Sequence, residues 1–309
     1  MNDTAPAIRV SGLTKSFGGK RVVDNFALEV PRGMIFGFLG PNGSGKTTTI
    51  RMLCGLLTPD SGEGSCLGYD IRRQSVEIKR RIGYMTQHFG LYEDMTVREN
   101  LEFIGRLYGV QPLAERTAQI LNEFGFTERV DQLAGQLSGG WKQRLALAAC
   151  VLHKPEMLLL DEPTAGVDPN ARREFWDMIN ALAAQNVTVL VSTHYMDEAV
   201  RCNRIAYLAA GKLLLQGTVD EVIDSSGLTA WTVTGPELIL LQAQLKDKPG
   251  VDMIAAFGNA LHVTGTDAAA LGRAIAPYQS DPRYRWDKAD PSLEDVFIYT
   301  IAKQKMAQP

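Results

Sequence analysis

Residues 40–47 have the composition of a phosphate-binding loop. They fit the pattern G-x-x-x-x-G-K-[ST], in the order Gly40, Pro41, Asn42, Gly43, Ser44, Gly45, Lys46 and Thr47. Glycines let backbone N–H groups turn toward a phosphate, and a helix that follows adds a favourable dipole. Lys46 would then contact the β- and γ-phosphates, and the Thr47 hydroxyl would bind Mg²⁺. The alternative is a glycine-rich turn with a lysine present by chance.

Two adjacent acids form the second candidate group. Asp161 and Glu162 directly follow the apolar run MLLL. One carboxylate suits Mg²⁺, held through water, and the next suits an attacking water in line with a γ-phosphate. A pair of solvated acids after a strand is the alternative interpretation.

Single polar residues end two further apolar runs. Gln87 ends IGYMTQ, and His194 ends VTVLVSTH. Either residue alone is more often a structural hydrogen-bonding group. Together with Lys46, Thr47 and the two acids, however, they complete a triphosphate site built from four strand ends.

A second possible anion site lies in the segment Leu137-Ser138-Gly139-Gly140-Trp141. It introduces the helical run WKQRLALAACVL, so Ser138 and the two glycines stand at a helix N-terminus. One nucleotide rarely needs two separate helix N-termini from one chain. The segment therefore favours contact with a nucleotide held by a partner.

The elements that must position these residues are strands of a parallel sheet. Continuous apolar runs at 34–40, 82–87, 156–163 and 187–194 are typical of buried parallel strands, and each ends next to a candidate group. Ligands of open α/β sheets lie at the carboxyl ends of the strands. Alternating runs between Ile8 and Val30 predict a small antiparallel sheet ahead of this core.

Two further regions have their own patterns. Between about 90 and 154 the pattern is helical, with Thr96 and Glu99 forming a capping box, which predicts an all-helical insertion. After a composition break at 224–227 the order is strand, helix, strand, strand, helix, strand, helix, as in a ferredoxin-like module. His262 is a lone histidine in this part, and packing is favoured over function for it. The predicted domains are 1–224 and 225–309.

Composition and charge exclude several classes of protein. A net charge of −3 with no long Lys/Arg run argues against nucleic acid as a partner. Four widely separated cysteines indicate reduced thiols rather than disulfides or a metal site. The N-terminus lacks the pattern of a signal peptide, and no apolar run approaches the roughly 20 residues that span a bilayer. We therefore expect a cytoplasmic chain without a membrane span.

The motifs together resemble one family. LSGGWKQR is similar to the signature motif of the ABC (ATP-binding cassette) ATPases, and it lies between GPNGSGKTT and MLLLDEPTAGVD as in that family. The resemblance covers Ile8 to about Gly217. It implies an α/β fold of the P-loop NTPase class: a RecA-like parallel core, an N-terminal antiparallel β subdomain and a helical insertion, here followed by the small ferredoxin-like α+β domain.

The resemblance also implies roles for individual residues. Phe17 would stack on adenine, Glu162 would be the catalytic carboxylate, His194 the switch histidine, and 165–168 the D-loop. Two such cassettes would close head to tail, so that each ATP is enclosed by the phosphate loop of one copy, with Thr48, and by Ser138, Gly139 and Gly140 of the other. Thr47, Gln87 and Asp161 would hold Mg²⁺. Two departures stand out: Phe17 replaces the commoner Tyr, and Trp141 occupies a position often held by Gln.

The resemblance favours an exporter among the functions of this family. QHFGLYEDMTVRENLEFIGRLYGV and the closing PSLEDVFIYTIAK resemble ATPase subunits of multidrug, antibiotic and lipid exporters. Such a subunit would work with a separate multi-helix permease at the cytoplasmic face of the inner membrane. The alternatives are an importer subunit, or a soluble ABC ATPase acting on DNA or on ribosomes. The absence of sustained heptads and of a second cassette argues against the soluble classes.

Overall fold

The structure is a computed structural model that describes residues 5–306. The chain divides into two compact units between Leu215 and Gln216, ahead of the composition break at 224–227. Each unit has its own hydrophobic core.

The first unit begins with a four-stranded antiparallel sheet. Its strands follow the order β2-β1-β4-β5, and the turn Gly18-Gly19 joins the first two, as the alternating pattern predicts. The bounds are β1 (Ile8–Phe17), β2 (Lys20–Val30), β4 (Ser61–Cys66) and β5 (Tyr69–Asp70). Buried apolar residues alternate with more exposed residues along much of β1 and β2, so one face of the sheet is buried.

A six-stranded sheet forms the centre of the first unit. Its order is β10-β9-β3-β8-β7-β6, and β9, β3, β8, β7 and β6 run parallel to one another. β3, β7 and β8 are buried along their whole length, which explains their unbroken apolar sequences. The bounds are β3 (Ile35–Leu39), β6 (Ile82–Met85), β7 (Met157–Asp161), β8 (Thr188–Thr193), β9 (Arg204–Ala209) and β10 (Lys212–Gly217). The predicted parallel core is confirmed.

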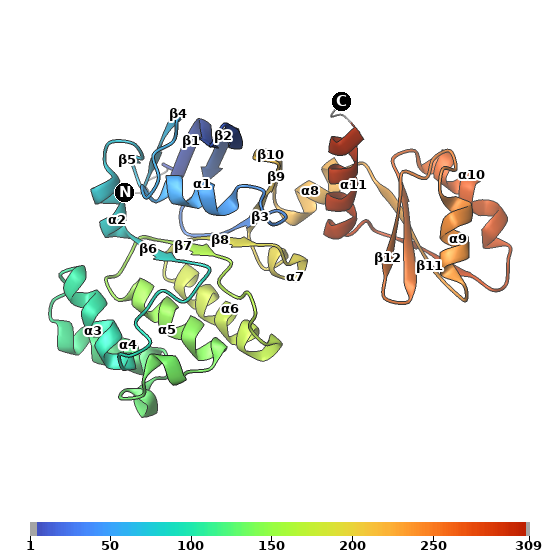
Figure 1. Ribbon diagram of the computed structural model, residues 1–309. Helices are drawn as coiled ribbons and strands as arrows, with labels where there is room; N and C mark the ends of the chain where they lie inside the picture. Colours follow the sequence, from blue (N-terminus) through green and yellow to red (C-terminus); the bar gives the residue numbers. More distant parts are fainter. Residues whose placement is uncertain (1–4, 307–309) are drawn as a thin grey trace. The chain divides into compact units, whose positions relative to one another are not determined.

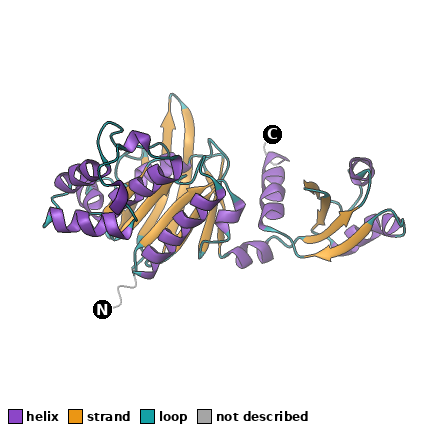
Figure 2. Cartoon of the chain, turned by 90° about the horizontal axis from the view of Figure 1, so that it is seen from below, coloured by secondary structure: helices purple, strands orange, loops and turns teal. Residues whose placement is uncertain are grey.

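Helices cover both faces of this central sheet. In Figure 1, α1 lies between the two sheets, whereas α5 and α6 lie on the opposite face of the central sheet. Figure 2, seen from below, shows helices packed around the strands. Phe26 of β2 and Phe38 of β3 meet edge to face, with ring centroids 5.7 Å apart, inside the core shared by the two sheets. The bounds are α1 (Lys46–Leu53), α2 (Ser75–Arg81), α6 (Pro169–Ala184) and α7 (Met196–Ala199).

The predicted insertion between 90 and 154 is helical. It contains α3 (Val97–Leu107), α4 (Leu113–Glu123), two 3₁₀ turns (Thr127–Arg129 and Ala134–Gln136) and α5 (Gly139–Val151). The capping box is present: Thr96 Oγ1 accepts from the Glu99 N–H at 3.2 Å, and Glu99 accepts from the Thr96 N–H at 2.8 Å. Buried Asn100 bonds to backbone groups of the preceding turn and anchors α3 to it.

The second unit has the ferredoxin-like order of elements that the sequence predicts. Its antiparallel sheet follows β12-β13-β11-β14, and α9 and α10 supply apolar side chains to its core. His262 Nδ1 lies 3.1 Å from buried Asp295, so it connects β13 to α11 inside this unit, in agreement with a packing role. The bounds are α8 (Val219–Ser225), β11 (Thr229–Thr234), α9 (Leu238–Leu245), β12 (Met253–Phe257), β13 (Ala260–Gly265), α10 (Ala268–Gln279), β14 (Arg285–Ala289) and α11 (Leu293–Met306).

No helix within residues 5–306 combines the length and the apolar character that crossing a bilayer requires. The four cysteines are free thiols, as predicted.

Candidate functional site

The phosphate loop connects β3 to α1. Gly40 has φ +153°, and a Cβ there would lie 2.1 Å from the carbonyl oxygen of Leu208, so only glycine fits. Lys46 is the first residue of α1 and is 4% exposed. Its Nζ donates to the carbonyl oxygens of Gly40 at 2.7 Å and of Pro41 at 3.3 Å. These bonds hold the ammonium group inside the loop.

The hydroxyl residues of the loop and of the start of α1 suit an anionic ligand such as a phosphate. Ser44 is buried, and its hydroxyl has no hydrogen-bond partner within the described part of the chain. A buried hydroxyl without a partner is costly unless a ligand or water satisfies it. Thr47 and Thr48 are half-buried at the start of α1, where the helix dipole favours an anion.

The two acids lie at the carboxyl end of β7 and are held by one residue of β8. Asp161 is opposite Ser192 in the parallel register, and Ser192 Oγ donates to Asp161 Oδ1 at 2.7 Å. The same hydroxyl accepts from the backbone N–H of Glu162 at 3.0 Å. Glu162 has φ +48°, a left-handed conformation that costs free energy for a residue with a Cβ. Ser192 therefore stabilises a strained turn.

Three side chains converge on the Glu162 carboxylate. Lys46 Nζ lies 3.1 Å from Oε1, and Gln87 Nε2 donates to Oε2 at 3.4 Å. His194 Nδ1 lies 3.2 Å from Oε2, although its angles are not those of a hydrogen bond. Gln87 follows β6 and His194 follows β8, the two strands beside β7. Lys46 follows β3, which lies on the far side of β8. The structure thus brings the four predicted strand ends together, and their role as a triphosphate site stays a prediction.

The oxygen donors of this site suit Mg²⁺ better than a softer metal. Thr47, Asp161 and Gln87 offer hydroxyl, carboxylate and amide oxygens. The described residues contain no cluster of three His, Cys, Asp or Glu side chains that could hold a metal ion by themselves. Mg²⁺ usually binds through one or two protein oxygens together with water and substrate phosphates, so this sparse set fits it.

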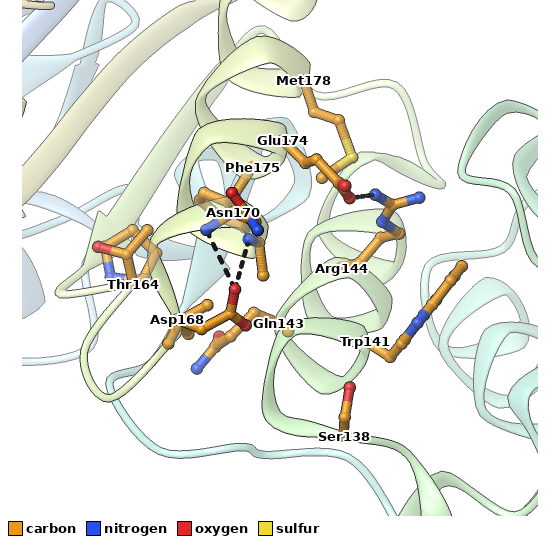
Figure 3. A pocket seen from close by; sticks show the side chains of 14 residues that line it. Ser138, Trp141, Gln143, Arg144, Thr164, Asp168, Asn170, Glu174, Phe175 and Met178 are labelled. Carbon is orange, nitrogen blue, oxygen red and sulfur yellow. Dashed lines mark hydrogen bonds and ion pairs between the residues drawn. The ribbon is translucent and has the colours of Figure 1, made fainter.

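The segment Ser138 to Gly140 forms a separate site. Ser138 is the N-cap residue of α5, but its exposed side chain makes no capping bond. A pocket of about 220 Å³ lies between the starts of α5 and α6, and none of its lining residues belongs to the phosphate loop. Figure 3 shows Ser138 and Trp141 on one side and Asp168 on the other. Asp168 caps α6 by accepting from the N–H groups of Asn170 and Ala171 at 3.0 Å each.

The two unusual aromatic residues have different surroundings. The guanidinium carbons of Arg129 and Arg144 lie over the Trp141 ring, 4.7 and 4.6 Å from its centre, and Phe126 meets the ring edge to face. It is thus held within the helical insertion. Phe17 ends β1 and is 50% exposed, which leaves its ring available for stacking.

Known proteins are similar to this chain in sequence and in fold. The family described as "ABC transporter" matches residues 23–165. The Nod factor export ATP-binding protein I of Paraburkholderia xenovorans is 38% identical over 303 residues, which cover 96% of this chain and 98% of that protein. The chain belongs to the ATP-binding proteins of the ABC transporter family.

Two further similarities place it within that family. The probable multidrug ABC transporter ATP-binding protein YbhF of Escherichia coli is 46% identical over 217 residues, or 70% of this chain; the match spans only 38% of that longer relative. A solved dimeric ATP-binding cassette, MJ0796 bound to ADP and Pi, is 25% identical with a TM-score of 0.63, and the match covers 68% of this chain and 98% of that one.

Sequence reasoning about this ABC cassette missed Ser192. It lies inside the apolar run VTVLVSTH, so it looks like a minor interruption of a buried strand. The available signal was its position two residues before His194, which places Ser192 near the end of its strand. It would then lie beside Asp161 only if β7 and β8 are neighbours. That adjacency becomes visible only in the sheet order.

Proposed function

We propose that this chain hydrolyses ATP to ADP and phosphate. The convergence of Lys46, Gln87 and His194 within 3.4 Å of the Glu162 carboxylate carries the proposal. A carboxylate so placed can orient a water molecule and take its proton as the water oxygen bonds to the γ-phosphorus and the bond to ADP breaks. Lys46 would offset charge on the phosphates, and His194 would hold the water or a γ-phosphate oxygen.

Mg²⁺ would accompany the nucleotide, and when bound it neutralises charge on the phosphates. The Thr47 hydroxyl, the Asp161 carboxylate and the Gln87 amide oxygen would hold it. Ser192 fixes one oxygen of Asp161, which leaves the other free to face the ion's water shell.

The working unit we propose is a head-to-tail homodimer. The exposed Ser138 and Gly139 would meet the nucleotide held by the phosphate loop of the second copy. The similarity to a dimeric cassette supports this arrangement. Glu162 is present in every copy, so both sites should be competent. Phe17 would stack on the adenine of its own nucleotide.

ATP hydrolysis would drive export through a separate permease. This chain would bind that permease at the cytoplasmic face of the inner membrane. A groove of about 200 Å³, with Met85, His88, Leu91, Ile104 and Tyr108 in its lining, lies beside the strand end that carries Gln87. Beside it, the half-exposed rings of Tyr92 and Phe103 meet edge to face. An apolar helix of a membrane protein would fit this surface, and movement of Gln87 would connect it to the nucleotide.

The test is to purify Glu162→Gln from its native membrane with ATP present and to identify bound proteins by mass spectrometry. Recovery of a polytopic membrane protein supports the transporter assignment and identifies the permease. Recovery of ribosomes or DNA-repair proteins without a membrane protein would replace it with a soluble function. The matched control is Lys46→Ala, which should lose the ATP-dependent part of the recovery.

A further inference from the structure

A buried carboxylate outside the catalytic group joins the acidic turn to α7. Glu198 is fully buried, and Thr164 Oγ1 donates a hydrogen bond to its Oε1. Thr164 lies two residues after Glu162, in the turn that leads to α6. A carboxylate is rarely buried unless it is paired and hydrogen-bonded, because desolvation of the charge is costly. Glu198 plays no part in the reaction proposed above.

The second partner of Glu198 leads back to His194. Arg172 of α6 places its Nε 3.7 Å from Glu198 Oε1, and its guanidinium carbon lies 4.2 Å from the centre of the Tyr195 ring. That ring is in turn 4.1 Å from the ring of His194. A continuous series of contacts therefore runs from the acidic turn through Glu198, Arg172 and Tyr195 to His194. We call these residues, with Thr164, the Glu198 cluster.

The start of α6 also touches the segment that would meet the second copy. A Cβ on Gly140 would lie 2.6 Å from the Cβ of Ala171, the residue before Arg172, so α5 and α6 approach as closely as glycine permits. Arg144 of α5 also pairs with Glu174 of α6, as the dashed line in Figure 3 marks. Because these surfaces are in direct contact, a displacement of residues 138–140 must move the first turn of α6.

The Glu198 cluster is incompletely bonded in this arrangement. Within the described residues, neither Arg172 Nε nor Glu198 Oε2 has a hydrogen-bond partner, and both atoms are buried. Each unsatisfied group costs free energy. Arg172 Nε lies 3.7 Å from Glu198 Oε1, so a small approach of α6 toward α7 would turn this contact into a hydrogen bond. The cluster therefore has a better-bonded alternative close to this one.

We propose that Glu198 is a positioning residue that connects the signature segment to His194. It holds the turn 162–168 through Thr164, and it sets the position of the Tyr195 and His194 rings through Arg172. Approach of a second copy at residues 138–140 shifts the start of α6, tightens the cluster and brings His194 into its working position. The inference rests on the proposed function, because the position of His194 matters to catalysis only if the chain hydrolyses ATP.

The first test observes His194 directly and needs no nucleotide. The chain has four histidines, so imidazole NMR signals are few, and His194→Ala identifies the signal of interest. Glu198→Gln and Thr164→Val should each shift the His194 signals, whereas the signals of His262, in the other unit, should stay in place. Asp197→Asn is the matched control. It removes the same charge from the same helix, but Asp197 is 67% exposed, so solvent weakens its pair with Arg172, whereas Glu198 is buried.

The second test is steady-state kinetics. Glu198→Gln and Thr164→Val should lower kcat at least tenfold and leave KM for ATP within twofold, because neither side chain belongs to the phosphate loop. Asp197→Asn should stay within twofold of the parent in both constants. Thr164→Val removes only the hydroxyl at similar volume, so it carries the test if Glu198→Gln folds poorly.

The two readouts separate the inference from the proposed function. Unchanged His194 signals in both variants, or a kcat within twofold of the parent in both, would overturn the role of Glu198. A parent chain without ATP turnover would refute the proposed function, while shifted His194 signals would still establish the connection through the cluster.

Discussion

Ser192 lies opposite Asp161 in the register of β8 and β7, and its hydroxyl donates to the Asp161 carboxylate at 2.7 Å. The bond uses the only proton of the hydroxyl, so the oxygen is left to accept from the N–H of Glu162. One buried side chain thus orients the proposed metal-binding acid and supports the left-handed backbone of the proposed catalytic acid. Correct placement of both acids depends on the neighbouring strand.

We expect Ser192→Ala to raise the Mg²⁺ concentration needed for half-maximal ATP hydrolysis by about tenfold or more, as loss of an outer-shell partner does at other metal sites. It should also lower the free energy of unfolding by about 1–3 kcal/mol, because Asp161 loses a buried partner. Titration of activity with Mg²⁺ and denaturant unfolding measure the two effects. Ser192→Thr keeps the hydroxyl and should keep the parent's Mg²⁺ requirement; an alanine variant with that same requirement would refute the role of Ser192.

Lys46→Ala should weaken ATP binding about 10- to 150-fold, since a hydrogen bond from a charged group contributes about 1.5–3 kcal/mol. The substitution also leaves the buried Glu162 carboxylate without its cation at 3.1 Å. Equilibrium binding of a fluorescent ATP analogue is the measurement. The control is Lys20→Ala, because Lys20 is exposed and lies outside the loop. Binding equal to the parent's in Lys46→Ala would show that the loop does not hold the phosphates.

Two neighbouring glycines of the signature segment should respond differently to alanine. At Gly140 the new Cβ would lie 2.6 Å from the Cβ of Ala171, whereas at Gly139 it would meet no atom within 4 Å. Gly140→Ala should therefore lower the free energy of unfolding by about 1–3 kcal/mol through overpacking, and Gly139→Ala should leave it unchanged or raise it slightly. Thermal unfolding of the two variants decides this, and equal destabilisation would contradict the close approach of α5 and α6.

The buried cysteines should resist thiol reagents in the folded chain. Burial raises the pKa of Cys54 to about 11 and that of Cys66 and Cys202 to about 12, so at pH 8 almost none of these thiols is ionised. An aromatic disulfide reagent should label them slowly until denaturant is added, and then label all of them. Rapid native labelling of Cys66 or Cys202 would mean that the core opens readily.

Sequence alone predicted the elements whose pattern is local. The Gly40–Thr47 loop, the capping box of Thr96 and Glu99, and the buried strands each depend on residues within one segment. The convergence of Gln87 and His194 was also predictable, because parallel strands deliver their carboxyl ends to one edge of the sheet.

Contacts between distant segments could not be predicted in the same way. The bond between Ser192 and Asp161 depends on β7 and β8 being neighbours, and the bond between Thr164 and Glu198 depends on how α7 packs beneath the turn. Nothing in the residue types near Glu198 distinguishes it from the exposed Asp197 beside it. Only burial, which the tertiary fold decides, separates the two acids.

The most direct test of the account compares ATP turnover by the parent chain and by Glu162→Gln. The variant keeps the size of the side chain but cannot take a proton from water. We predict that it binds ATP, accumulates as an ATP-bound dimer on size-exclusion chromatography, and turns over at least about a hundredfold more slowly than the parent. A Glu162→Gln variant that hydrolyses ATP at the parent's rate would contradict the central claim, which is that Glu162 is the catalytic carboxylate.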